Sequence, residues 1–127
     1  MKGITDAKNV VQNMIKIKRI YEDYSETDGF RILIDRLWPR GISKERAKID
    51  LWIKEIAPST DLRKWYSHNS EKAKQFQKKY ITELKGNSDS LNKVKKIIHD
   101  QKTITLLYAA KDSKPIHAIV LQKTLKD

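Results

Sequence analysis

The segment 30–35 contains an uninterrupted apolar run, Ile32-Leu33-Ile34. A strand with one face in water alternates apolar and polar residues, whereas a strand buried on both faces reads as a continuous apolar run. Such strands are typical of parallel sheets that are covered on both sides. The segment therefore predicts a strand buried on both faces, in an α/β sheet with helices packed on it.

Three other segments have the pattern of strands. A period-2 pattern over residues 15–21 and the apolar run 103–110 both predict strands. Residues 51–56 fit either a helix or a strand, and we favour a strand because Pro58 disfavours helix in the residue before it.

Caps and helical spacing predict several helices. Ser43 is placed to cap a short helix, and Ser59 or Thr60 to cap the next one. The apolar faces of the longer helices are expected from Leu62, Trp65 and Tyr66; from Ala73, Phe76, Tyr80 and Leu84 after Ser70; from Leu91, Val94, Ile97 and Ile98; and from Ile116, Ile119, Val120 and Leu125 after Pro115.

The alternation of strands and helices predicts one compact α/β domain over residues 14–127, with a small sheet that is mainly parallel or mixed. The helical stretch before residues 103–110 is long enough for a parallel crossover. The link between the first two strands has only about eight residues, which is short for such a crossover, so a hairpin is the alternative there. Residues 1–13 are polar and are expected to form an N-terminal extension, either disordered or helical.

The composition excludes several kinds of reactive and metal-binding site. The chain of 127 residues has no cysteine, which excludes disulfides, thiolate nucleophiles and cysteine-based zinc sites. Its histidines, His68, His99 and His117, are too widely spaced for a metal-ligand pattern, so no metal or cofactor is expected. We expect His68 and His99 to lie on the surface. The chain has no apolar run of the ~20 residues that span a bilayer and no signal-peptide pattern at its start, which favours a cytoplasmic location.

The formal net charge of +11 favours anionic partners, either nucleic acid or small molecules with phosphate or carboxylate groups. The competing interpretation is that the excess only solvates helix faces and keeps the protein soluble. Much of it comes from lysines in the predicted helices: Lys72, Lys74, Lys78, Lys79, Lys93, Lys95 and Lys96.

Polar and aromatic residues follow three of the predicted strands. In parallel sheets the carboxyl ends of the strands share one edge, and ligands bind there. Guanidinium groups bind phosphate or carboxylate through paired hydrogen bonds. The expected anion-binding residues are Arg36, Trp38, Arg40, Lys54, Ser59 and Lys111, and the candidate catalytic residues are His117, for proton transfer, and Tyr108.

A structural role is the alternative for each of these residues. Arg36 and Arg40 could brace the turn by pairing with a nearby carboxylate, for which the candidates are Asp35, Asp50 and Asp112. Trp38 could fill the core, and Tyr108 and His117 could serve only packing or capping. The chain has no nucleophile elbow, phosphate-binding glycine loop or dinucleotide fingerprint.

Three motifs resemble the YeaO-like family of bacterial proteins, domain of unknown function 488. They are the run 31–41 (RILIDRLWPRG), the run 51–59 (LWIKEIAPS) and the run 106–112 (LLYAAKD) with His117. The resemblance covers about residues 14–125 and implies a compact α/β fold, a bacterial cytoplasmic setting and a domain that begins near Met14. It supplies no activity.

The leading hypothesis is a cationic pocket for a phosphate- or carboxylate-bearing small molecule at the carboxyl ends of the strands. The alternative is a basic nucleic-acid-binding module without catalysis, with affinity that falls steeply as salt rises. A third interpretation is a structural or partner-binding protein with the turn around Trp38 buried.

Overall fold

The computed structural model describes residues 14–67, 69–111 and 115–126; the predicted extension, His68 and Asp112 lie outside these ranges. Its sheet has four strands in the order β1-β4-β2-β3, and every neighbouring pair is parallel. The expected α/β class and mainly parallel sheet are thus confirmed. The strands are β1 (Met14–Arg19), β2 (Phe30–Leu33), β3 (Leu51–Trp52) and β4 (Thr103–Tyr108).

The hairpin considered for the first two strands is wrong, because β4 lies between β1 and β2 and runs parallel to both. The segment 20–29, which includes a 3-10 turn at Glu26–Asp28, instead returns across β4. An extended chain reaches up to about 3.3 Å per residue. Two strand spacings of about 4.8 Å and the length of one strand therefore lie within the reach of this short segment.

The helices follow the predicted caps and apolar faces. Ser43 accepts the N–H of Arg46 and Ser59 accepts that of Leu62, as N-caps do. No helix in the described part of the chain is long and apolar enough to cross a membrane. The helices are α2 (Lys44–Ala47), α3 (Thr60–Tyr66), α4 (Ala73–Gly86), α5 (Ser88–Gln101) and α6 (Ile116–Lys126), with 3-10 turns at Lys54–Ile56 and Ser70–Lys72.

The strand predicted over residues 51–56 is right only for its first two residues. β3 is an edge strand, paired with β2 alone, and the N–H of Ile53 makes its last bond to this strand. The chain then forms a 3-10 turn that buries Ile56 completely. Burying this apolar side chain in the helical layer stabilises the fold more than continued strand pairing at the sheet edge would.

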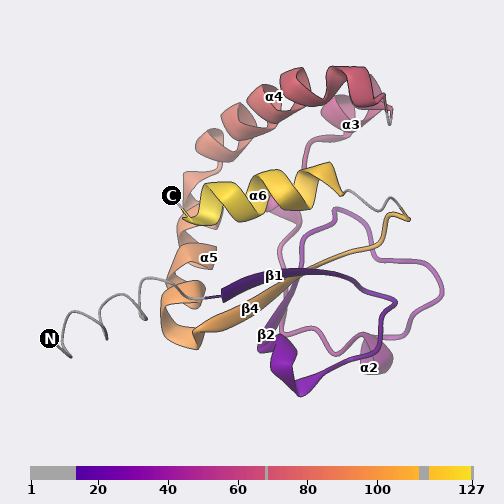
Figure 1. Ribbon diagram of the computed structural model, residues 1–127, viewed down its shortest axis with the longest axis vertical. Coiled ribbons are helices and arrows are strands. Elements are labelled where there is room, and N and C mark those ends of the chain that lie inside the picture. The colour runs from indigo at the N-terminus through magenta and orange to yellow at the C-terminus, as the bar shows by residue number, and fades with distance from the viewer. Residues whose placement is uncertain (1–13, 68, 112–114, 127) are drawn as a thin grey trace, which may run out of the picture.

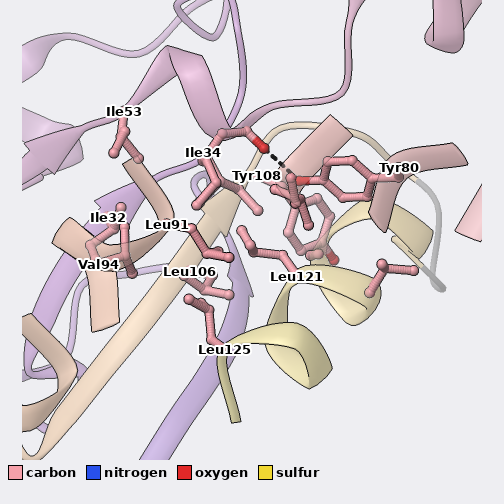
Figure 2. Close-up of a cluster of buried hydrophobic side chains, with 14 of the residues drawn as sticks. Ile32, Ile34, Ile53, Tyr80, Leu91, Val94, Leu106, Tyr108, Leu121 and Leu125 are labelled. Carbon is pink, nitrogen blue, oxygen red and sulfur yellow. Dashed lines mark hydrogen bonds between the residues drawn. The ribbon is translucent and has the colours of Figure 1, made fainter. Parts of the chain in front are cut away.

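The two faces of the sheet are covered differently. On one face Ile32, Leu106 and Tyr108 pack against α4, α5 and α6, and Figure 2 shows this core. On the other face Leu33 and Leu107 pack against the segment 20–29 and the turn region that contains α2; this helix lies apart from α4 and α6 in Figure 1. The prediction that β2 is buried on both faces is confirmed.

A buried ion pair joins the crossing segment to the sheet. Arg31 of β2 is 1% exposed, and its Nη1 donates to Asp28 Oδ2 at 2.5 Å. The guanidinium also donates to the carbonyls of Ala47 and Lys48, at the end of α2. Lys18 of β1 donates to both oxygens of Asp28. One carboxylate thus links β1, β2 and the crossing segment.

Hydrogen bonding keeps Asp28 ionised. Burial opposes ionisation, but hydrogen bonds from Lys18, the N–H of Ser25 and Arg31 outweigh it and hold the pKa of Asp28 below its usual value. Asp28 therefore stabilises the fold in its charged form.

Gly29 is the position where the crossing segment enters β2. Its φ is +67°, and a Cβ placed there would lie 2.3 Å from the carbonyl oxygen of Thr103. This oxygen belongs to the backbone of β4, so it cannot move aside as a flexible side chain would. Only glycine fits this crossing.

We expect Gly29→Ala to lower the free energy of unfolding by about 3 kcal/mol, because backbone strain and a clash with β4 act together. Urea unfolding followed by circular dichroism measures the change. Gly86→Ala is the matched control, since Gly86 ends α4 with open space around it and alanine is the better helix former. Equal stability of Gly29→Ala and the wild type would contradict the crossing geometry.

Asp28→Asn should lower the free energy of unfolding at pH 7 by about 3 kcal/mol, because it leaves the buried Arg31 without its counter-charge. The lowered pKa means that the stabilisation from Asp28 is complete above about pH 4 and is lost as the pH falls through its folded-state value. Urea titrations between about pH 2 and pH 7 should therefore show a shallower acid limb for the variant. If the free energy of unfolding of the variant and of the wild type changed with pH in the same way, the partners of Asp28 would not stabilise its carboxylate.

Candidate functional site

Asp35 is the centre of the polar site at the carboxyl edge of the sheet. It comes just after β2, and its Oδ2 accepts the N–H of Ala109, just after β4, at 2.9 Å. Its Oδ1 lies 3.1 Å from Nε2 of His117, in the first turn of α6. Asp35 thus connects the ends of two strands with the start of a helix, and this local structure determines where the imidazole lies.

The pairing determines which nitrogen of His117 carries the proton. An ionised carboxylate only accepts hydrogen bonds, so Nε2 carries the proton that points to Asp35. No hydrogen bond from a described residue reaches Nδ1. The His117 side chain is 17% exposed, which leaves it in partial contact with solvent. A neutral His117 therefore presents a hydrogen-bond acceptor beside the sheet edge, and a protonated one presents a donor.

Tyr108 stands next to this imidazole. The two rings meet edge to face, with centroids 6.1 Å apart and an interplanar angle of 89°. Tyr108 is only 6% exposed and belongs to the core under α6 (Figure 2). Its ring therefore supports the position of His117 from the core side.

Arg36 braces the neighbouring loop. Its Nη2 donates to the carbonyls of Ala57 and Pro58 at 3.1 and 3.4 Å, and it forms no ion pair with a described carboxylate. Arg36 thus braces the turn, as the alternative interpretation of the sequence proposed, but it does so through backbone carbonyls and not through a described carboxylate. Nε of Arg36 is buried and is without a hydrogen-bond partner among the described residues.

Ser59 is engaged by a carboxylate that the sequence did not point to. Glu83 of α4 accepts the N–H of Ser59 at 2.9 Å and its hydroxyl at 2.5 Å. The same hydroxyl oxygen accepts the N–H of Leu62 at the start of α3. Ser59 therefore acts as the N-cap of α3. Glu83 occupies the position from which an anion would otherwise contact Ser59.

Tyr80 shows how closely these charged groups lie together. Its hydroxyl donates to the carbonyl of Ile56 at 2.6 Å. Burial, with the negative charges of Glu83 and Asp35, raises the pKa of Tyr80, whereas the positive charge of Arg36 opposes the rise. Tyr80 stays protonated and serves as a buried donor between α4 and the loop after β3.

The structure places Trp38 toward the opposite face of the sheet. Its Nε1 donates to the carbonyl of Ile42, and its ring meets the edge of Trp52 at a centroid distance of 5.5 Å. Both rings pack against the second hydrophobic cluster, in agreement with the core-filling alternative. Trp52 also donates from Nε1 to the backbone carbonyl of Asp35 at 2.7 Å.

The other predicted cations lie on the surface. Lys54 is exposed and holds its ammonium 4.3 Å from the centre of the Trp52 ring. Arg40 is exposed, and its carbonyl accepts the hydroxyl of Tyr21. Lys111 is exposed just after the strand end that holds Asp35. Arg40 and Arg36 therefore have different surroundings, and the described contacts do not join them in one clamp.

Sequence reasoning missed the part played by Asp35, Glu83 and Arg19. The many nearby cations favour a counter-ion role for Asp35, although a carboxylate directly after a buried strand lies where the strand ends meet. Arg19 donates to the carbonyls of Ala109 and Ala110 and secures the same strand end. No signal in the sequence links Glu83 to Ser59, because that contact depends on how α4 packs. Among the described residues, no group of three or more histidine, aspartate or glutamate residues could hold a metal ion.

Asp35→Ala should lower the free energy of unfolding by about 2 kcal/mol, because it leaves the N–H of Ala109 and the imidazole of His117 without their acceptor. His117→Ala removes only the second of these bonds and is expected to cost less. Thermal unfolding of the two variants measures the difference. If His117→Ala were the more destabilising, the site would be organised by packing of the imidazole and not by the carboxylate.

Comparison with known proteins places the chain among bacterial relatives. Residues 14–127 match the family model described as the inactive DUF488-N3 subclade. The chain is 41% identical to the uncharacterized protein YeaO of Escherichia coli K12 over 112 residues, which cover 88% of this chain and 96% of that protein. It is 35% identical to the uncharacterized proteins Mb3100c of Mycobacterium bovis and Rv3073c of Mycobacterium tuberculosis over 116 residues, 91% of this chain and 97% of each relative. No solved structure matches the chain significantly.

Proposed function

Because the chain belongs to the YeaO-like family, in the subclade described as inactive DUF488-N3, we propose that it binds a phosphate- or carboxylate-bearing small molecule without transforming it. The binding site is the carboxyl edge of the sheet, around the Asp35–His117 pair. The observation that carries the proposal is a histidine whose Nε2 is held by a carboxylate, while no described residue forms a hydrogen bond with its Nδ1.

Three cationic side chains lie at this edge of the sheet. The guanidinium of Arg19 is held against the carbonyls of Ala109 and Ala110, and that of Arg36 against Ala57 and Pro58. Neither arginine forms an ion pair with a described carboxylate. Lys111 adds an exposed ammonium just beyond the same strand end. These three cations outnumber the two described carboxylates at this edge, Asp35 and Glu83, and an excess of positive charge favours an anionic ligand.

The hydrogen-bonding groups fit an oxyacid. A monohydrogen phosphate has a hydroxyl that can donate to Nδ1 of neutral His117, while its other oxygens face the cations. A carboxylate has no such hydroxyl and would be held by the cations alone. Nε of Arg36 provides a further buried N–H that no described residue accepts, and a group of this kind costs about 1–3 kcal/mol until it is satisfied.

Binding without turnover agrees best with the neighbours of the histidine. A general base acts on a nucleophile within hydrogen-bond reach. Among the described residues, the hydroxyl of Ser59 is held by Glu83, and that of Tyr80 by the carbonyl of Ile56. These two hydroxyls are therefore engaged elsewhere, in keeping with a site that supplies an acceptor and positive charge for binding.

Thermal unfolding with added anions tests the proposal, with inorganic phosphate, citrate and glycerol phosphate as probes and glycerol as the uncharged control. A ligand at ten times its dissociation constant stabilises the folded state by about 1.4 kcal/mol, which corresponds to roughly 4 °C for a domain of this size. We expect such a shift for at least one anion and none for glycerol.

His117→Ala should remove most of this shift, and Lys111→Gln should reduce it. His99→Ala is the matched control, because His99 is an exposed histidine on α5 without a part in the site. Equal shifts in all three variants would locate anion binding elsewhere. The absence of any shift up to about 20 mM of each probe would refute the proposed function.

A further inference from the structure

The positive charge of the protein is concentrated in its helical segment. Residues 60–102 contain eleven lysine or arginine residues against five aspartate or glutamate residues, so they hold more than half of the net charge of +11. This segment forms α3, α4 and α5. In Figure 1, α4 lies at the outer side of the molecule, with α6 between it and the strands.

One face of α4 is a stripe of lysines. Successive residues of an α-helix are 100° apart, which places Lys74, Lys78 and Lys85 within a sector of about 40°. All three side chains are exposed, and none forms an ion pair with a described residue. The rise of 1.5 Å per residue gives the stripe a length of about 16 Å.

The acidic residue of α4 does not offset this charge. Glu83 is the one carboxylate in the helix, and both of its oxygens are occupied by Ser59. Glu83 is thus directed to the sheet edge and away from the stripe. The outer surface of α4 presents ammonium groups without a carboxylate between them.

Trp65 is already engaged by two other lysines, one of which is on α4. Lys72 and Lys79 hold their ammonium groups 4.9 and 5.0 Å from the centre of the Trp65 ring. Binders of single-stranded nucleic acid use free aromatic faces on which bases stack. Among the residues given above, the α4 face offers charge but no free aromatic ring, so it suits a ligand that is recognised through its phosphates alone.

We propose that the lysine stripe of α4 docks against the phosphate backbone of double-stranded nucleic acid, independently of base sequence. A duplex has one phosphate per about 1.7 Å of axis, so a stripe of about 16 Å faces several phosphates at once. Lysine is suited to this task because its ammonium acts as a compact point charge that meets a phosphate in many orientations. This surface is separate from the carboxyl-edge site and does not depend on it.

Fluorescence anisotropy with a labelled duplex of about 20 base pairs of mixed sequence, at about 20 to 200 mM NaCl, tests this inference. We expect saturable binding at low salt and a log–log slope of the association constant against salt of about −2.7 or steeper. The variant Lys74→Gln/Lys78→Gln/Lys85→Gln should bind at least about tenfold more weakly at the lowest salt and lose about 2.7 from the slope.

The matched control is Lys44→Gln/Arg46→Gln/Lys102→Gln, which removes the same charge from exposed positions outside α4. It should keep most of the affinity and the slope. The restoring variant Lys74→Arg/Lys78→Arg/Lys85→Arg keeps the charge and should bind as the wild type does.

Three outcomes would overturn the proposal. The first is no binding at the lowest salt. The second is equal weakening by both glutamine variants, which would show a response to net charge alone. The third is binding to polyglutamate or to phosphatidylserine vesicles that is as tight as to the duplex and equally sensitive to the α4 variant, which would assign the stripe to acidic proteins or membranes.

Discussion

The buried pair of Arg31 and Asp28 is the interaction on which the rest of the structure depends. Arg31 lies in a strand whose two faces are both covered, and a buried guanidinium is tolerated only when its donors are satisfied. Its partners are the carboxylate of Asp28 and the carbonyls of Ala47 and Lys48. These contacts hold the crossing segment and the end of α2 against the same face of the sheet. Loss of Asp28 would leave the guanidinium of Arg31 buried without its counter-charge.

The candidate site is a consequence of this layering. One face of the sheet is covered by loops and the other by helices. β2 lies between β3 and β4, and its carboxyl end lies beside that of β4. The pairing of Leu33 with Leu107 brings Asp35 to the N–H of Ala109, and α6 brings His117 to the same carboxylate. A polar pair is thus positioned by strand register and helix packing. The lysine stripe on α4, by contrast, needs only an exposed helix face.

Local patterns predicted the elements well, because they depend on neighbours in the sequence. The apolar run at Ile32 identified a strand buried on both faces, and Ser43 and Ser59 identified helix starts. Arg31, directly before that run in the same strand, carries a further signal, since an arginine in a doubly buried strand requires a carboxylate partner. The short β3 and the insertion of β4 between β1 and β2 could not be predicted, because edge pairing and strand order depend on contacts between distant segments.

The sequence by itself determined the class of the protein: a small basic α/β domain of the YeaO-like family, with its helix faces, its caps and a strand-end motif rich in arginine and tryptophan. Tertiary structure alone decided what that motif does. It directed Trp38 to the second cluster, engaged Arg36 with backbone carbonyls and joined Asp35 to His117 across 82 positions of the chain. Composition and period report burial and backbone preference, whereas the partner of a polar group is set by which chain segments the packing brings together.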